Sequence, residues 1–129
     1  GSRLRVSTVE NVSQSTIAYT CGYTTDTRVY EKILHVAHGM GVKRILTNWS
    51  PALDYCLVAS GAIEGVICND NDVYDNVAGK LLVIEAGGAI FDMDGNREQN
   101  ILSTKFIASN GTQGMRDLLT AMTVPIISW

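Results

Sequence analysis

The sequence lacks the features that mark a membrane-spanning, exported or nucleic-acid-binding protein. No apolar run approaches the roughly 20 residues that a helix needs to cross a bilayer, and no signal-peptide pattern is recognised at the start. The net charge is −3, and Lys43 and Arg44 are the only adjacent basic pair, so the clustered basic face of a phosphate-backbone binder is missing. We therefore expect a cytoplasmic protein that binds neither membranes nor nucleic acid.

Cysteine is also scarce. Cys21, Cys56 and Cys68 are an odd number at long spacings, and they form neither a CxxC pair nor a Cys/His set suited to zinc. Disulfides are rare in the reducing cytosol, so free thiols are the expected state.

What the sequence does contain is the composition of one ordinary globular domain. Its 129 residues are 46% hydrophobic and 18% charged, and a chain of this size can bury roughly two thirds of the surface that it exposes when unfolded. Gly1 and Ser2 resemble a cloning remnant. We expect residues 1–14 to be an N-terminal segment and residues 15–129 to form a single α/β domain.

Strand and helix patterns alternate along that domain. β-Branched and aromatic residues predict strands, and apolar residues at helical spacing followed by glycine predict helices. Ser50 is expected to cap a helix through its side chain, with Pro51 at the first helical position. The alternation predicts a layered α/β structure with at least partly parallel strands. The expected strands are 15–23, 43–46, 62–69, 89–93 and 105–109, and the expected helices are 26–39, 51–60, 75–86 and the later half of 110–122.

Asp75 stands at an expected helix start, directly after an expected strand. A carboxylate there can stabilise the helix by about 1 kcal/mol, through its unpaired N–H groups and the helix dipole. It can also project into the crevice at the strand ends, where α/β proteins bind ligands, and hold a metal ion. The local pattern leaves both interpretations open.

Two other patterns suggest metal sites less strongly. His35 and His38 lie three residues apart on an expected helix, but no third ligand is evident, and exposed histidines explain the spacing better. Asp92 and Asp94 follow an expected strand, where they could hold magnesium or act in phosphoryl transfer; the alternative is an ordinary turn at Gly95.

Three stretches together resemble the second half of the inositol monophosphatase family, the magnesium-dependent, lithium-sensitive sugar phosphatases. They are SPALDYCLVASGAIEGVI, VYDNVAGKLLVIEAGGAIFDMDG and FIASN, and the similarity runs from Leu4 to about Met122. The resemblance implies the layered α/β/α C-terminal domain of that fold, with a mixed sheet flanked by helices. It also implies that Asp75 is a Mg²⁺ ligand, with Tyr74 where the family's motif has tryptophan, and that the acids of FDMDG belong to a turn.

Other positions depart from the family pattern. The family's Gly-Ser/Thr-Ala segment, which lies against the substrate, matches Trp49, Ser50 and Pro51. The acidic residue that contacts a sugar hydroxyl in inositol-specific members matches Cys68, which cannot replace a carboxylate as an acceptor. These four positions are the expected substrate contacts, and they leave the substrate's identity open.

The family's first half, with its water-activating Glu and its D-x-D-G-T metal loop, has no match in this chain. The resemblance therefore implies the C-terminal half of a longer phosphatase, cut out by design or left after proteolysis. The whole enzyme would hydrolyse inositol phosphate or a related sugar phosphate, with Mg²⁺ shared between the N-terminal half and Asp75. The half present here would be inactive alone, and a homodimer is left open.

Two kinds of alternative remain. One is fructose bisphosphatase, histidinol phosphatase or nucleotide-phosphate phosphatase activity on the same scaffold, because fold alone does not fix the substrate. The other is a non-catalytic binding or assembly domain, which the missing half and the changed Trp49 and Cys68 favour, whereas Asp75 favours the enzyme.

Overall fold

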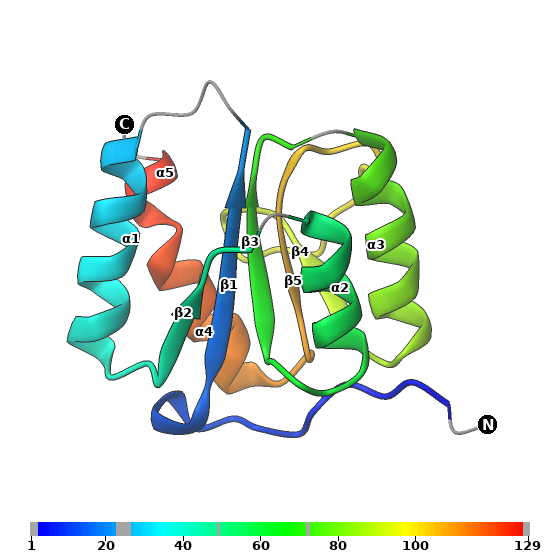
Figure 1. Cartoon of the computed structure of the whole chain (residues 1–129), viewed down its shortest axis with the longest axis horizontal. Helices are drawn as coiled ribbons and strands as arrows, with labels where there is room; N and C mark the ends of the chain where they lie inside the picture. The colour runs from blue at the N-terminus through cyan, green and yellow to red at the C-terminus, as the bar shows by residue number, and fades with distance from the viewer. Residues whose placement is uncertain (1–2, 23–26, 49, 72, 128–129) are drawn as a thin grey trace.

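The structure is a computed structural model that describes residues 3–22, 27–48, 50–71 and 73–127. Its five strands and its four longer helices follow one another in the order that the sequence predicted (Figure 1). The elements are a short 3-10 turn η1 (Val12–Gln14), β1 (Thr16–Cys21), α1 (Thr27–Met40), β2 (Arg44–Leu46), α2 (Pro51–Ala59), β3 (Gly65–Asn69), α3 (Val73–Glu85), β4 (Ala89–Phe91), β5 (Lys105–Ser109), α4 (Gln113–Met122) and α5 (Val124–Ile127).

The strands form one mixed sheet in the order β2-β1-β3-β5-β4. β1 pairs in parallel with both β2 and β3, whereas β5 runs antiparallel to β3 and β4. The parallel pairs are joined by helical crossovers, as parallel strands require. This confirms the mixed α/β sheet that the sequence and the family resemblance predicted.

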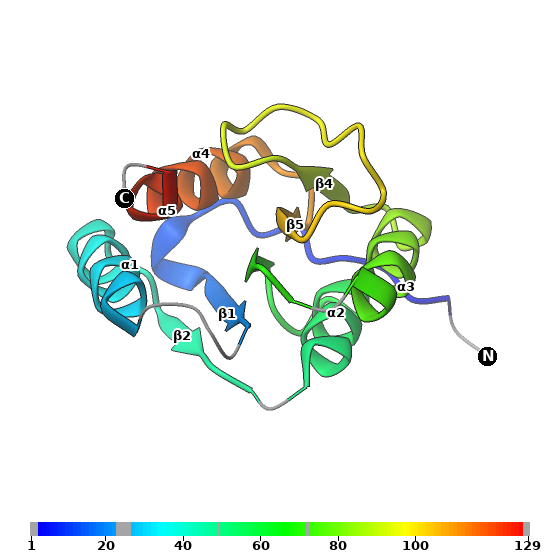
Figure 2. The same cartoon turned by 90° about the horizontal axis from the view of Figure 1, so that it is seen from above.

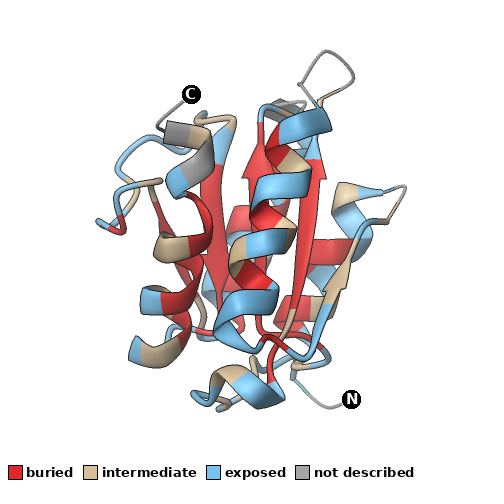
Figure 3. Ribbon diagram, turned by 90° about the vertical axis from the view of Figure 1, so that its left-hand side faces the viewer, coloured by how far each residue is buried: buried red, intermediate tan, exposed pale blue. Residues whose placement is uncertain are grey.

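Helices cover both faces of the sheet. Figure 2 shows α1, α4 and α5 on one face and α2 and α3 on the other. Side chains alternate between the two layers along a strand, because successive residues point to opposite faces. In β1, Ile17 and Tyr19 pack in the cluster with α1 and α4, whereas Ala18 packs in the cluster with α2 and α3. The buried residues accordingly concentrate in the strands and on the inward sides of the helices (Figure 3).

Several element boundaries differ from the predicted ones. β3 begins at Gly65 rather than at residue 62, because Gly61 adopts a φ of +82° and the amide of Ala62 bonds back to the last turn of α2. α3 begins two residues before Asp75, at Val73, and β4 ends at Phe91 instead of continuing to residue 93. Asp75 therefore lies inside the first turn of α3.

Two properties of the side chains and helices agree with this picture. Cys21, Cys56 and Cys68 are free thiols, as their spacing predicted. In the part of the chain that the structure describes, no helix is long and apolar enough to cross a membrane.

Candidate functional site

The candidate site lies where β1 and β3 end together. The two strands are parallel, with Cys21 opposite Asn69, so their carboxyl ends meet at one edge of the sheet, the upper edge in Figure 1. α3 begins at this edge, and the side chain of Asp75 in its first turn is exposed. The carboxylate is therefore available to a ligand at the kind of strand-end crevice where α/β proteins bind them.

The turn between β3 and α3 is hydrogen-bonded to neighbouring segments at this edge. Asp70 has a φ of +73°, which is uncommon for a residue with a side chain and is tolerated best by Asn and Asp. Its amide donates to the carbonyl of Thr104 at 2.7 Å, and the Thr104 hydroxyl donates back to the Asp70 carboxylate at 2.9 Å. Asn71 then donates from Nδ2 to the Thr20 hydroxyl of β1 at 2.6 Å. The turn is thus fixed to two neighbouring segments.

Asn76, the residue after Asp75, is fully buried. Its Oδ1 accepts from the hydroxyl of Tyr55 on α2 at 2.7 Å and lies 3.6 Å from the Cys68 sulfur on β3. Its Nδ2 donates to the carbonyl of Asn71 at 3.4 Å. Burial raises the pKa of both the Tyr55 hydroxyl and the Cys68 thiol, so these groups stay protonated donors at neutral pH.

One turn further along α3, Lys80 is also buried. Its ammonium donates to the carbonyls of Ile101 at 2.9 Å and Ser103 at 2.8 Å, with a longer contact to Asn100 at 3.4 Å. It also lies 4.2 Å from the centre of the Phe106 ring. Burial lowers the Lys80 pKa. The Lys80 side chain thus connects α3 to the 100–103 loop. This loop is followed by Thr104, which is hydrogen-bonded to Asp70 in the turn before α3.

The four predicted substrate contacts lie in different environments. Pro51 is half-buried at the first position of α2, and Ser50 is exposed before it in extended backbone. The Ser50 side chain makes no capping hydrogen bond, so that part of the prediction is wrong, although Ser50 does occupy the cap position. Trp49 lies outside the described residues. Cys68 is fully buried within the α2 and α3 cluster, and its sulfur is 3.4 Å from the Thr104 carbonyl.

α2 carries a further buried acid, Asp54, in its first turn. The side chain of Asn48 donates to its Oδ1 at 2.6 Å, whereas its Oδ2 is buried with no hydrogen-bond partner among the described residues. Burial raises the Asp54 pKa, and the Asn48 hydrogen bond opposes that rise.

The weaker candidates have structural explanations. His35 and His38 are both exposed on α1. Asp92 accepts from the amides of Asp94 and Asn96, and Gly95 in this turn has a φ of +86°. The FDMDG acids therefore form the turn that the family resemblance implied.

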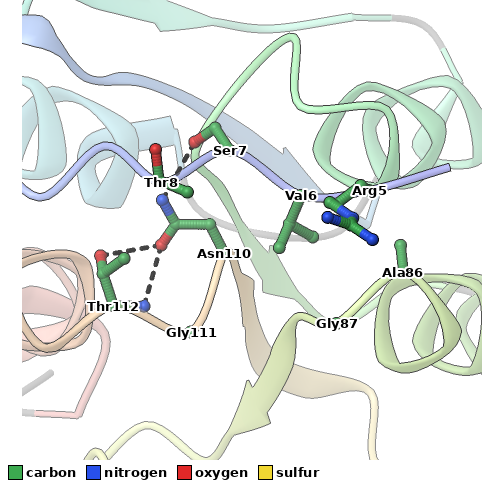
Figure 4. Close-up of a pocket in the computed structure, with 9 residues that line it drawn as sticks. All are labelled: Arg5, Val6, Ser7, Thr8, Ala86, Gly87, Asn110, Gly111 and Thr112. Carbon is green, nitrogen blue, oxygen red and sulfur yellow. Dashed lines mark hydrogen bonds between the residues drawn. The ribbon is translucent and has the colours of Figure 1, made fainter.

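A cavity of about 370 Å³ lies at the other edge of the sheet, between the N-terminal segment, the end of α3 and the loop before α4 (Figure 4). Three of the polar side chains there bond to one another: Asn110 donates to the Ser7 hydroxyl at 3.0 Å and accepts from the Thr112 hydroxyl at 2.9 Å. This hollow is separate from Asp75, and none of the described residues that line it is acidic.

The donor set fits Mg²⁺ only in part. Mg²⁺ prefers oxygen ligands and usually keeps several waters while binding one or two carboxylates. Asp75 supplies an exposed carboxylate of the right chemistry. Among residues 3–22, 27–48, 50–71 and 73–127, no three His, Cys, Asp or Glu side chains gather into a metal site. These residues can therefore contribute one ligand to a site completed from elsewhere.

Sequence reasoning missed Tyr55, Asn76 and Lys80 as a buried polar group. A signal was present, because Asn76 and Lys80 are four residues apart on the helix face that continues to buried Val83. Polar residues on an otherwise apolar helix face indicate buried partners, since unpaired polar groups are costly to bury. The partners themselves come from α2 and from loops distant in sequence, which the pattern of α3 does not reveal.

An α/β domain of this fold also occurs in proteins of known structure and sequence. The sequence profile of the inositol monophosphatase family matches residues 1–127. An inositol-1-monophosphatase from Mesorhizobium japonicum is 35% identical over 91 residues, which is 70% of this chain and 32% of that protein. The chain therefore belongs to the inositol monophosphatase family.

Solved structures agree with this assignment. The IMPase of Thermotoga maritima superposes with a TM-score of 0.80 at 25% identity, over 99% of this chain and 48% of that one. The extragenic suppressor protein suhB from Bartonella henselae gives a TM-score of 0.76 at 30% identity, over 93% of this chain and 46% of that one. The chain thus spans about half the length of these solved relatives and about a third of the curated one.

Proposed function

We propose that this chain is the C-terminal half of a magnesium-dependent phosphomonoesterase of the inositol monophosphatase type. The observation that supports this most strongly is the carboxylate of Asp75, which is exposed in the first turn of α3. The sequence resemblance matches this residue to the family's metal ligand. Family membership and the half-length match to phosphatases support the same conclusion.

In the whole enzyme, Asp75 would hold one side of Mg²⁺, with the other protein ligands supplied by the N-terminal half. When bound, Mg²⁺ supplies charge that stabilises the transferring phosphoryl group and lowers the pKa of a bound water. Asp75 contributes negative charge and a fixed position. Its exposure is what allows ligands from outside this chain to share the ion.

The substrate class is inferred from the four predicted substrate contacts. We propose inositol phosphate or a related sugar phosphate, with Ser50 and Pro51 at the start of α2 facing the sugar. Trp49, which lies outside the described residues, stays a contact predicted from the sequence. The position of Cys68 is the one that matches the acidic contact of inositol-specific members, but its sulfur is enclosed by Asn76 and Thr104. A buried thiol cannot supply the charged acceptor of those members, so the proposal does not single out inositol phosphate.

The test is Asp75→Asn in the full-length protein, assayed with saturating Mg²⁺ on several sugar phosphates. We expect kcat to fall at least about 100-fold, because the change removes a ligand charge from an ion that stabilises transition-state charge. Asp117→Asn is the matched control, since Asp117 is an exposed helical acid on α4 whose carboxylate bonds to Gln113. Near-normal turnover by folded Asp75→Asn would refute the metal role and leave Asp75 as a helix-stabilising acid.

A further inference from the structure

Asp75 is itself exposed, so something else must fix the first turn of α3 on which it stands. The first four N–H groups of a helix have no partner within the helix, and helix ends fray for that reason. The preceding turn contains Asp70 in an uncommon left-handed conformation, which adds strain at this point. A metal ligand must stay within about 0.5 Å of its binding position, so it needs a neighbouring residue that prevents such fraying.

Asn76 has the contacts to do this. A single buried amide joins the first turn of α3 to three segments: α2 through the Tyr55 hydroxyl at 2.7 Å, β3 through the Cys68 thiol at 3.6 Å, and the β3–α3 turn through the Asn71 carbonyl at 3.4 Å. Because Asn76 is bonded to Asp75 through the main chain, fixing the Asn76 amide fixes the direction in which the Asp75 side chain leaves the helix.

The chemistry of the contacts requires an amide. The Tyr55 hydroxyl and the Cys68 thiol are donors, whereas the Asn71 carbonyl is an acceptor, so the central side chain must accept on one side and donate on the other. Carboxylates cannot donate, and apolar side chains would leave the buried Tyr55 hydroxyl unpaired. Asn in a helix interior is otherwise an unfavourable choice, which indicates that these contacts compensate for it.

We propose that Asn76 is a positioning residue that holds the first turn of α3, and with it Asp75, in the orientation needed for metal binding. The proposal rests on the proposed function for the role of Asp75, but the anchoring itself can be measured without any metal or substrate. In this proposal Asn76 fixes the first turn of α3, in addition to contributing to the stability of the whole domain.

Three variants of this 129-residue chain separate the local effect from the global one. Asn76→Leu removes all three contacts while keeping the number and branching of the side-chain heavy atoms. It also removes the Asn76 acceptor from the buried Tyr55 hydroxyl, so stability falls. In the double variant Asn76→Leu/Tyr55→Phe that hydroxyl is gone, and we expect the melting temperature to recover most of the loss. Tyr55→Phe alone is a milder change that removes one anchor and keeps the Asn76 amide.

The first measurement is hydrogen exchange along α3. We expect the amides of residues 77–79, which bond to the first turn, to exchange at least about fivefold faster in both variants that carry Asn76→Leu, relative to amides 82–85 of the same helix. Tyr55→Phe should give a smaller increase in the same amides. If the double variant regains the wild-type ratio together with its melting temperature, Asn76 is only a structural residue and the proposal fails. Equal acceleration along the whole helix also overturns it.

The second measurement is line broadening by Mn²⁺, used as a paramagnetic substitute for Mg²⁺, in NMR spectra of the same proteins. In the wild type we expect selective broadening of the first-turn amides of α3 at millimolar Mn²⁺, and its loss in Asp75→Asn. The double variant should need several-fold more Mn²⁺ for the same broadening. Unchanged Mn²⁺ dependence in the double variant would contradict positioning. Absence of selective broadening in the wild type would instead count against Asp75 as a ligand, while the exchange ratio still decides the anchor.

Discussion

At the residue scale, Asp54 is the side chain whose burial has the clearest consequence for stability. It is fully buried in the first turn of α2, and only its Oδ1 has a described partner, the side chain of Asn48. Removing a carboxylate from water disfavours the charged form, so its pKa is raised. The folded state therefore binds a proton at this group more tightly than the unfolded state does.

This linkage predicts how stability depends on pH. An unfolded Asp titrates near about 3.9, so the stability associated with protonated Asp54 is fully present below that pH. It is lost as the pH rises through the raised folded-state pKa. Asp54→Asn removes the titration. We expect the melting temperature of the variant, minus that of the wild type, to increase as the pH rises from about 4 towards neutrality. Parallel melting curves against pH for the two proteins would contradict this account.

At the element scale, α2 and α3 approach each other closely. A Cβ atom added to Gly79 would overlap the ring of Tyr55, so only glycine lets the two helices come this near. The Tyr55 ring is fully buried and stacks near Phe106, with ring centres 6.0 Å apart. The same approach brings the Tyr55 hydroxyl to Asn76, which links this packing to the candidate site.

Gly79→Ala should therefore destabilise the fold by roughly 1 to 3 kcal/mol, since overpacking moves the helices apart and exceeds the gain in helix propensity. The matched control is Gly39→Ala in α1, where an added Cβ would meet nothing within 4 Å. That change should stabilise the protein by about 0.5 to 1 kcal/mol. Urea unfolding of both variants measures the difference. Two changes of the same sign would show that the α2 and α3 contact is looser than described.

The sequence predicted best the elements that bury a single face, because their apolar residues then recur at a regular spacing. The apolar spacing of Val29, Ile33 and Ala37 identifies α1, and all three are buried. The boundary of β3 was less predictable, because Gly61 could be read as a helix end without showing that residues 62–64 fold back before the strand. The buried polar group around Asn76 depends on tertiary partners, and no local pattern states which ones.

The candidate site likewise has features that the sequence predicted and features that it did not. Asp75 could be found from its place after a strand and at a helix start, and the metal role that we propose for it came from the family resemblance rather than from periodicity. The enclosure of Cys68 could not be found, because all five residues of β3 are buried and the strand shows no alternation. The missing capping bond of Ser50 was equally hidden, since a serine before Pro51 looks the same whether or not its hydroxyl bonds to the helix.

At the scale of the whole molecule, the domain has a complete hydrophobic layer on each face of its sheet but an incomplete site at the edge where Asp75 lies. Among the described residues, Asp75 belongs to no group of three or more His, Cys, Asp or Glu side chains that could hold a metal ion. Mg²⁺ held by one carboxylate and several waters binds weakly and is not fixed against a substrate. We therefore propose that the chemistry takes place between this chain and the N-terminal half of a longer protein.

The most direct test of that division is a complementation assay. The chain alone, a separately expressed N-terminal half of the proposed longer protein, and their mixture are each assayed with Mg²⁺ on several sugar phosphates. We predict turnover by the mixture, none by this chain alone, and loss of the mixture's activity in Asp75→Asn. Magnesium-dependent turnover by the 129-residue chain alone, abolished by Asp75→Asn, would show that a complete site exists within it and would contradict the account.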